Sequence, residues 1–510
     1  MTEALDNILT PEQAADYSAQ AKQNGQCLVM THGVFDVLHL GHVRHLSKAK
    51  QEGDLLIVSI TDDEFVNKGP GRPYFTARVR AEMLASIDIV DAVVISHYPS
   101  AVPMLECVKP CVYAKGAEYA NPADDISGKI TEEQEAVEKH GGRIAFTEDV
   151  VFSSSSLINK HFSSIYSDEL HLYLSERREP EFMEELAALI EKTAELRVLV
   201  IGDAIMDEYI YVHAMAKASK ENIIATKYAE KELFAGGVFA TANHMAGLCK
   251  NVEILTCLGA DRTDLKTINS SLKPNVKLSK IERPGTPTTR KTRFIDKSYW
   301  RKLFEVYDFE DDPLPPHIQQ EFDDLVRSKI NDFDMVVVND FGHGLLANST
   351  IELIQNEGKF LAANAQTNSA NIGFNLITKY DRADFICIDA PEARLAAGDK
   401  HNPIESVMHT LSDSVQCSKM IVTHGEQGCI IFEGDKQLRC IPAFTKSVVD
   451  TVGAGDAFLS MAAPLVAIGA PMEHAAFIGN AAGALKVGIV GHSKSVEKSS
   501  LVSYLRALLK

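Results

Sequence analysis

The sequence has 510 residues, of which 45% are hydrophobic and 24% charged, and its 51 basic and 70 acidic side chains give a formal net charge of −19. A chain of this length exceeds one ordinary hydrophobic core, so we expect two or three globular domains. The acidic balance argues against a general nucleic-acid binder or a membrane-surface protein, although local Lys and Arg clusters can still bind anions. Nine scattered cysteines favour reduced thiols in a cytoplasmic protein. The first 24 residues lack an apolar core and do not predict a signal peptide.

The N-terminal segment predicts the start of a parallel α/β sheet. Thr10 followed by Pro11 and an acidic turn predicts a capped helix that ends near Gln23. A short apolar run at 27–30 predicts a buried strand, which leads through a glycine turn into a helix over 43–52. Ligands bind at the carboxyl ends of the strands in folds of this kind, so we expect a site between this strand and helix.

Two histidines, His39 and His42, stand at the predicted start of that helix, with Gly41 between them. Both imidazoles can point toward one phosphate chain and stabilise charge as an α-phosphate is attacked and pyrophosphate leaves. The histidines alone would equally fit a metal-binding or surface pair. Together with Gly33-Val-Phe-Asp36 they form G-x-F-D-x-x-H-x-G-H, which resembles the signature of the cytidylyltransferase-like nucleotidyltransferases.

Later segments of the first half agree with this resemblance. Lys68-Gly-Pro-Gly-Arg-Pro73 is a basic loop suited to anion contact, and Lys109 to Tyr119 resembles the family's K-P-x-x-x-x-K-G-x-x-Y segment. Ser153 to Ser156 resembles its Ser-rich nucleotide-binding helix start, although a plain helix cap needs only one Ser. The resemblance implies His39, His42 and a nearby lysine, Lys48, as catalytic residues. It implies nucleotide contacts by Gly33, Phe35, Asp36, Lys115, Ser154, Ser155 and Ser156.

The composition becomes strongly charged between Ser167 and Glu195. We therefore predict a transferase domain over 1–166, a helical linker over 167–195 and a second domain over 196–510. Each half is long enough to bury its own core. Fragments ending near Ser175 and starting near Glu181 are expected to keep their separate activities.

The second half restarts the fold with a buried strand at 197–203. Gly236 and Gly237 then open a helix, and Thr288 to Arg293 is a basic, strand-like run that would also fit a solvated edge strand. Met335 to Asp340 and Met420 to Thr423 predict two further buried strands.

The stretch Asp450-Thr-Val-Gly-Ala-Gly-Asp-Ala-Phe458 carries most of the functional information in this half. Small residues before an apolar helix present unpaired N–H groups and the positive end of a helix dipole, which is an anion site. Asp456 would repel a phosphate there, unless it takes a proton from the hydroxyl that attacks that phosphate. The string resembles the signature of the ribokinase-like (PfkB) sugar kinases. The resemblance implies that Asp456 is the catalytic base and that Gly453, Ala454 and Gly455 form the anion hole.

The same resemblance assigns the remaining site residues. It implies sugar binding by Asp203, Asp207, Gly236, Gly237, Asn243 and Arg293, with Arg293 on a lid. It implies that Asp389 and Glu392 order Mg²⁺ and phosphate. It implies nucleotide binding by Thr423, Gly425, Gly428 and Asn480.

Three departures from the family pattern concern the substrate. Asp389 replaces a usual Asn, Asn364-Ala-Gln366 lacks the Asp-Pro-Lys charge of heptose kinases, and His343 stands where a Lys is common. These departures leave the sugar open and leave the reaction centre intact.

The predicted fold class is α/β, with two Rossmann-like domains: an N-terminal HxGH nucleotidyltransferase fold and a C-terminal ribokinase-like fold with a small β lid. The pair resembles the bifunctional heptose kinase/nucleotidyltransferases of surface-polysaccharide synthesis, with the domain order reversed. The resemblance implies ATP and Mg²⁺ for the kinase, and CTP or ATP as nucleotidyl donor.

Two alternatives stay open at this point. The substrate would be a polyol or glycerol-type phosphate in the first, and one half would be an inactive sensor or scaffold in the second. The expected partners are sugar phosphates, nucleoside triphosphates and further copies of the chain in a homodimer or higher homo-oligomer, with no nucleic acid and no membrane.

Overall fold

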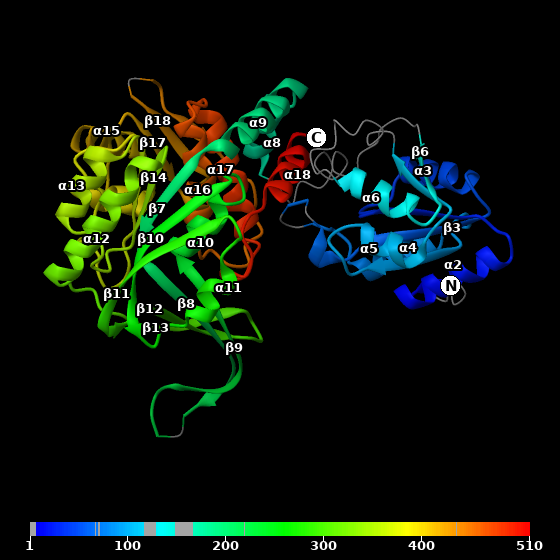
Figure 1. Cartoon of the computed structure of the whole chain (residues 1–510), viewed down its shortest axis with the longest axis horizontal. Helices are drawn as coiled ribbons and strands as arrows, with labels where there is room; N and C mark the ends of the chain where they lie inside the picture. The colour runs from blue at the N-terminus through cyan, green and yellow to red at the C-terminus, as the bar shows by residue number, and fades with distance from the viewer. Residues whose placement is uncertain are drawn as a thin grey trace. The chain divides into compact units, whose positions relative to one another are not determined.

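The computed structural model describes residues 7–66, 68–69, 72–116, 129–147, 167–218, 220–434 and 436–510. The chain divides into two compact units, one of Met1–Asp168 with Val502–Lys510 and one of Glu169–Leu501. Each unit contains a mainly parallel sheet flanked by helices (Figure 1), which confirms the predicted α/β class. None of the described helices is long and apolar enough to cross a membrane.

The first unit contains a six-stranded parallel sheet in the order β1-β4-β3-β2-β5-β6. Its strands are β1 (Ile8–Leu9), β2 (Leu28–Gly33), β3 (Leu55–Thr61), β4 (Ala92–Ser96), β5 (Val112–Gly116) and β6 (Arg143–Thr147). The strand order reverses at β2, because β3 pairs on one side of it and β5 on the other. The carboxyl end of β2 is therefore the switch point at which such sheets bind ligands.

Helices cover both faces of this sheet. They are α2 (Pro11–Gln23), α3 (Leu40–Gln51), α4 (Ala77–Ala85), α5 (Val102–Val108) and α6 (Lys129–Glu138). Val29 packs with Leu46 of α3 and Leu84 of α4, whereas its neighbour Met30 packs with Met104 of α5 on the other face. Burial on both faces explains why the strands are continuous apolar runs without alternation.

The second unit contains a nine-stranded sheet in the order β11-β10-β7-β14-β15-β16-β17-β18-β19. Its strands pair in parallel, except that β18 is antiparallel to both of its neighbours, β17 and β19. Its strands are β7 (Arg197–Gly202), β10 (Asn251–Asp261), β11 (Val276–Pro287), β14 (Met335–Asp340), β15 (Leu361–Ala365), β16 (Phe385–Asp389), β17 (Lys419–Thr423), β18 (Cys429–Glu433) and β19 (Arg439–Ile441). Its principal helices are α10 (Val238–Met245), α11 (Leu265–Ser271), α12 (Pro316–Lys329), α13 (Asn348–Glu357), α14 (Ala390–Ala397), α15 (Ile404–Val415), α16 (Ala454–Ala467) and α17 (Met472–Lys486). The last helix, α18 (Lys498–Leu509), begins in the second unit and belongs to the first unit from Val502 onward.

A four-stranded sheet, in the order β13-β12-β8-β9, forms the predicted lid of this unit. Its strands are β8 (Ala204–Lys217), β9 (Ile224–Gly237), β12 (Thr289–Asp296) and β13 (Arg301–Asp308). Lys291 and Arg293 are buried on alternate positions of β12, where a core-facing strand would carry apolar side chains. This face of the lid therefore covers a polar site.

The segment predicted as a linker belongs to the second unit. It folds into α8 (Asp168–Ser175) and α9 (Pro180–Lys192). Arg177 forms an ion pair of 2.5 Å with Glu473 of α17 and stacks over the Tyr173 ring at 3.7 Å. The rings of Phe182 and Phe477 meet edge to face at 5.3 Å. These contacts cover one end of α17.

We predict that a fragment of residues 181–510 is less stable than one of residues 167–510, because it loses Tyr173 and Arg177. Unpairing Glu473 from Arg177 costs about 1–3 kcal/mol, which corresponds to a Tm about 2–6 °C lower for a domain of this size. Calorimetry of both fragments measures the difference. Arg177→Ala in the longer fragment is the control and should reproduce part of the loss, while equal Tm values would contradict the prediction.

Candidate active sites

The start of α16 provides the anion hole predicted for the second unit. Gly453 precedes the helix with φ of 78°, and a Cβ there would lie 2.5 Å from Cε1 of His492, so only glycine fits. A Cβ on Gly455 would meet no heavy atom within 4 Å, so this part of the helix start faces open space. Its amides and the positive end of the helix dipole can therefore approach a phosphate closely.

The carboxylate of Asp456 lies buried in the first turn of α16. Its Oδ1 accepts hydrogen bonds from Asn339 Nδ2 at 3.1 Å and Gln366 Nε2 at 3.0 Å. Asn339 lies at the carboxyl end of β14, and Gln366 follows β15. Burial raises the pKa of Asp456, which makes its carboxylate a better proton acceptor.

Three of the predicted sugar-site residues meet beside this carboxylate. Arg293 of the lid forms an ion pair with Asp207 of β8, and Gly236 leaves no room for a Cβ, which would lie 2.0 Å from Asp207 Oδ2. His492, which the sequence did not suggest, places Nε2 3.3 Å from Asp207 Oδ2. Burial alone would raise the pKa of Asp207, but the hydrogen bond from His492 and the charge of Arg293 outweigh it and lower that pKa.

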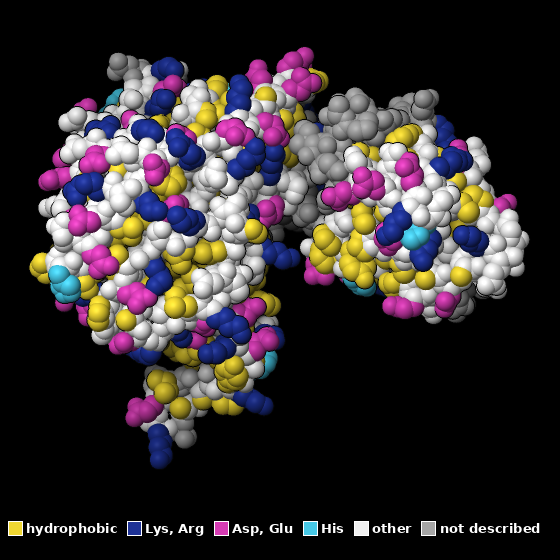
Figure 2. Space-filling view, viewed as in Figure 1, with side chains coloured by type: hydrophobic (Ala, Val, Ile, Leu, Met, Phe, Trp, Pro, Cys, Tyr) yellow, Lys and Arg dark blue, Asp and Glu magenta, His cyan; other side chains and the backbone are white. Residues whose placement is uncertain are grey.

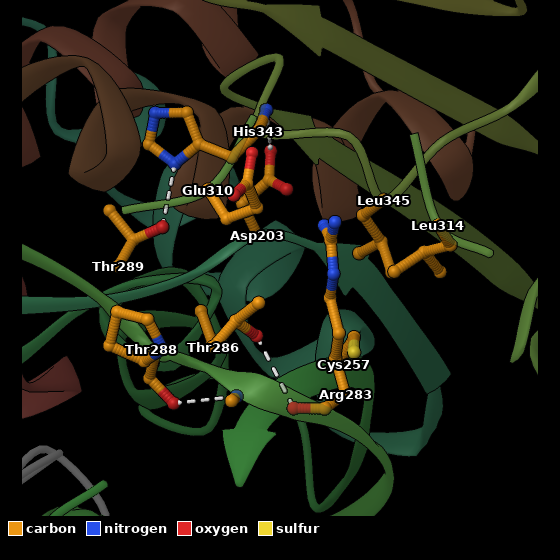
Figure 3. Close-up of a pocket in the computed structure, with 13 residues that line it drawn as sticks. Asp203, Cys257, Arg283, Thr286, Thr288, Thr289, Glu310, Leu314, His343 and Leu345 are labelled. Atoms are coloured by element: carbon orange, nitrogen blue, oxygen red, sulfur yellow. Dashed lines mark hydrogen bonds between the residues drawn. The ribbon is translucent and has the colours of Figure 1, made fainter. Parts of the chain in front are cut away.

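Asp203 faces a different pocket, shown in Figure 3. Its Oδ2 accepts hydrogen bonds from the backbone amides of Phe341, at 2.8 Å, and His343, at 3.5 Å. Burial raises the pKa of Asp203 to about 7 and lowers that of His343 to about 3, so the imidazole is neutral at physiological pH. The pocket is also lined by Cys257, Gly259, Arg283, Thr286, Thr288, Thr289, Glu310, Leu314 and Leu345, among others.

Two other predicted sugar-site residues have backbone roles. Gly237, with φ of 55°, turns the chain into α10. Asn243 lies six residues further, about 9 Å along that helix. Its amide donates to Ser271 O at 2.9 Å and accepts from Lys273 N at 3.0 Å, so it does not join Asp207 and Arg293.

Asp389 and Glu392 form the capping box of α14. Glu392 Oε1 also accepts a hydrogen bond from the Thr367 amide at 3.0 Å. Burial, and then the charge of Asp389, raise the pKa of Glu392 to about 8. Such carboxylate oxygens fit the chemistry of Mg²⁺, which keeps several waters and phosphate oxygens when a protein supplies few ligands. Within the described residues no group of three or more His, Cys, Asp or Glu is arranged to hold a metal ion.

The predicted nucleotide residues lie at one end of the β17–β18 hairpin and on α17. Thr423 ends β17, and Gly425 and Gly428 both have positive φ. A Cβ at Gly428 would lie 1.9 Å from Ile441 O, whereas one at Gly425 would meet open space. Asn480 donates to Pro442 O at 2.7 Å.

The first unit brings the two predicted histidines together at the start of α3. His39 caps the helix, with its Nδ1 accepting from the Gly41 amide at 3.1 Å, and His42 Nδ1 accepts from the His39 amide at 3.4 Å. The two rings stack with centroids 4.0 Å apart. The pair thus lies at the carboxyl end of the central strand β2, as the sequence predicts.

Lys68 supplies positive charge beside these histidines. Burial and the charges of His39 and Lys68 lower the pKa of His42 to about 3, and burial and Lys68 also lower that of His39. Burial lowers the pKa of Lys68 itself to about 8. At neutral pH the histidines are therefore uncharged donors, and Lys68 carries the charge. The sequence marks Lys68 only as part of a basic loop.

Gly33, Phe35 and Asp36 shape the floor of this site. Asp36 accepts from the amides of Tyr74, at 2.9 Å, and Phe75, at 3.2 Å. Phe35 holds a left-handed φ of 49° with its ring 5.4 Å from that of His42, and a Cβ on Gly33 would lie 3.1 Å from the Phe35 ring. Left-handed backbone at a bulky residue costs energy and is concentrated at functional sites.

Two predicted lysines have different surroundings. Lys48 lies six residues after His42, about 9 Å along α3 and on another side of the helix, so the structure does not place it with the histidine pair. Lys115, near the end of β5, forms an ion pair of 2.8 Å with Glu133. Ser154, Ser155 and Ser156 lie outside the described residues.

Comparison with known proteins agrees with the two predicted families. The sequence model of the pfkB family carbohydrate kinases matches residues 195–499, which is more than half of the chain. The chain belongs to the pfkB family of carbohydrate kinases. A cytidylyltransferase-like model matches residues 30–161, so the nucleotidyltransferase domain precedes the kinase domain, as predicted.

Among curated proteins, the chain is 24% identical over 310 residues to the bifunctional protein HldE of Trichlorobacter lovleyi, covering 60% of this chain and 62% of that one. It is 35% identical over 150 residues to HldE of Geobacter metallireducens, covering 29% of each. The matches thus span less than two thirds of these relatives. Phosphofructokinase-2 of Escherichia coli, in complex with substrates and products, aligns with a TM-score of 0.51 at 12% identity over 62% of this chain and all of that one, which supports the fold of the pfkB unit.

We predict that Asp456→Asn lowers phosphoryl transfer by about 10²–10⁴-fold, because a positioned general base is lost. Asn keeps an oxygen that accepts from Asn339 and Gln366, so ATP binding and Tm should be retained. Steady-state rates, ATP titration and thermal unfolding measure the three effects. Asp324→Asn, an exposed change on α12, is the control, and a variant with more than half the wild-type rate would exclude this role for Asp456.

We predict that kcat/KM for nucleotidyl transfer falls as the pH rises through about 8. The pKa of Lys68 is lowered to about 8, so its charge is present below that pH and is lost above it. His42, with a pKa of about 3, adds no change between pH 5 and 7. Pyrophosphate release measured against pH tests this. Lys68→Arg should abolish the fall, and a variant with the wild-type profile would refute the assignment.

Proposed function

We propose that the chain is a bifunctional enzyme that makes a nucleotide-activated sugar. The kinase unit would phosphorylate a sugar or sugar phosphate with ATP, and the transferase unit would join the product to a nucleotide and release pyrophosphate. The observation that carries this proposal is the pair of helix starts at Gly453–Asp456 and His39–His42, whose geometry suits a phosphate. The similarity to HldE favours a heptose phosphate in surface-polysaccharide synthesis.

In the kinase step, Asp456 would take the proton from the attacking sugar hydroxyl. The oxygen of that hydroxyl bonds to the γ-phosphorus as the bond to the β-phosphate oxygen breaks, while amides at the start of α16 stabilise the charge. Asn339 and Gln366 hold the carboxylate in place. Asp389 and Glu392 would hold Mg²⁺ together with water and phosphate oxygens, and the ion, when bound, neutralises phosphate charge.

In the transferase step, a phosphate oxygen of the sugar phosphate would attack the α-phosphorus of the nucleotide, and the bond to pyrophosphate would break. Neutral His39 and His42 would donate hydrogen bonds to the oxygens that gain charge, and the Lys68 ammonium would offset it. No covalent enzyme intermediate is required in this route. Either CTP or ATP is compatible with it.

The division of the chain into two compact units at Asp168 and Glu169 supports separate transferase and kinase domains, with α8 and α9 attached to the kinase. We also propose self-association. Hydrophobic side chains gather on the lid hairpin (Figure 2), where Met215, Ile223, Ile224 and Tyr228 are each more than half exposed. Light scattering measures the oligomeric state.

We predict that a coupled screen will identify the reaction pair. Sugar phosphates, polyol phosphates and glycerol phosphate are incubated with ATP and Mg²⁺, then with each nucleoside triphosphate, and pyrophosphate and product mass are recorded. A heptose phosphate should give both products. His42→Ala should abolish only the second step, whereas Asp456→Asn should abolish the first step and should allow the second only when the phosphorylated sugar is supplied. Turnover of a polyol phosphate alone would favour the polyol alternative, and one silent half would favour the sensor or scaffold.

A further inference from the structure

Lys486, the last residue of α17, has no solvent-exposed surface. Its Nζ donates hydrogen bonds of 2.7 Å to Val452 O and of 2.7 Å to Gly491 O. Val452 precedes Gly453 of the anion hole, and Gly491 precedes His492, which contacts Asp207. One buried ammonium thus joins the two chain segments that border the kinase site.

The oxygens around this ammonium are carbonyl oxygens rather than carboxylates. Among the described residues, no Asp or Glu oxygen lies within the 4.0 Å of an ion pair with Lys486, although the charges of Asp450, Asp456 and Asp207 act on it from further away. Backbone carbonyl oxygens are also the ligands that replace the hydration shell of potassium in proteins. The position therefore has the chemistry of a monovalent cation site, and the lysine side chain fills it.

Asp450 holds the same two segments by direct bonds. Its Oδ1 accepts from the Val452 amide at 3.1 Å and its Oδ2 from the Gly491 amide at 2.8 Å. Its carboxylate also binds Lys302, which is one-third exposed, and the hydroxyl of Tyr209. The amides of Val452 and Gly491 thus bind an anion, while their carbonyls bind a cation.

The side chain of Lys486 packs tightly against the turn at Gly453. A Cβ on Gly453 would lie 3.2 Å from Lys486 Cε, so the side chain packs directly behind the anion-hole turn. Burial lowers the pKa of Lys486 to about 8, against the raising effect of the nearby carboxylates, so most of it is protonated at neutral pH. Its charge lies behind the turn that would bind phosphate, where positive charge favours an anion.

We propose that the ammonium of Lys486 is a built-in monovalent cation that positions the Val452–Gly455 turn, so that the kinase needs no potassium or ammonium ion from solution. The proposal rests on the kinase function proposed above. Lys486 is a positioning residue, since it acts on phosphate through the turn. A lysine that only supports the fold would not make the variant lacking it dependent on a particular ion.

The experiment compares the full-length wild type with Lys486→Met, which keeps the length of the side chain and removes the charge. Kinase rates and Tm are measured with chloride salts of tetramethylammonium, sodium or potassium at equal ionic strength. The wild type should show the same rate, within about twofold, and the same Tm in all three salts. Lys486→Met should lose about 10–100-fold in tetramethylammonium. Potassium should restore at least part of that rate and raise the Tm of the variant by about 2–4 °C.

Lys302→Met is the matched control, because it removes a cation from the other side of Asp450 without opening the carbonyl site. Its rate and Tm should show no preference for potassium. The proposal is overturned if the wild type requires potassium, if Lys486→Met responds alike to all three salts, or if this variant and Lys486→Gln fail to fold even in potassium. The Tm comparison needs no kinase substrate, so it tests the cation site even where the screen finds no phosphoryl transfer.

Discussion

A helix start that can hold a phosphate is the feature on which the proposed chemistry of both units depends. The positive end of the helix must lie at the carboxyl end of a parallel sheet, and the turn before it must be narrow enough for close approach. In the first unit the turn is Gly33 to His39 at the end of β2. In the second unit it is Gly453, where a Cβ would lie only 2.5 Å from Cε1 of His492. The chemistry then differs only in the residue that faces the phosphate: neutral histidines in one, a buried carboxylate in the other.

Such a site buries charged side chains. Because water is excluded, each of them must be balanced by an opposite charge or a hydrogen bond from the protein itself. Asp207 is balanced by Arg293 and His492, and Asp450 by Lys302. Asp203 accepts hydrogen bonds from the backbone amides of Phe341 and His343, but burial and then the charge of Asp340 raise its pKa to about 7. Carboxylates that stay ionised therefore act as fixed anchors, and those with raised pKa values are the ones available to exchange protons or bind cations.

The sequence predicted the features that depend on residues close together in the chain. The helix starts at the HxGH and DTVGAGD motifs, the strand before the first of them and the capping of α2 are short-range features, and the structure contains them where they were expected. It did not predict His492 as part of a site, because its partner Asp207 lies far away in the chain. It marked Lys68 as part of a basic loop suited to anion contact but gave no role to that residue alone. The sugar contact of Asn243 stays a prediction: the motif gives its spacing, while its amide bonds to Ser271 O and the Lys273 amide, far away in the sequence.

The departures from the family pattern lie on the substrate side of the kinase. His343 is neutral, so it cannot supply the charge that a lysine would bring to this position. Asn364 donates to Cys387 O at 2.7 Å and is part of the sheet rather than the site. Arg283 and Lys291 are two positive groups near this position, Arg283 in the wall of the Asp203 pocket and Lys291 on the buried face of the lid. Selection among phosphorylated sugars would therefore depend on where their phosphate reaches these two side chains, while Asp456 and its amides serve any hydroxyl placed beside them.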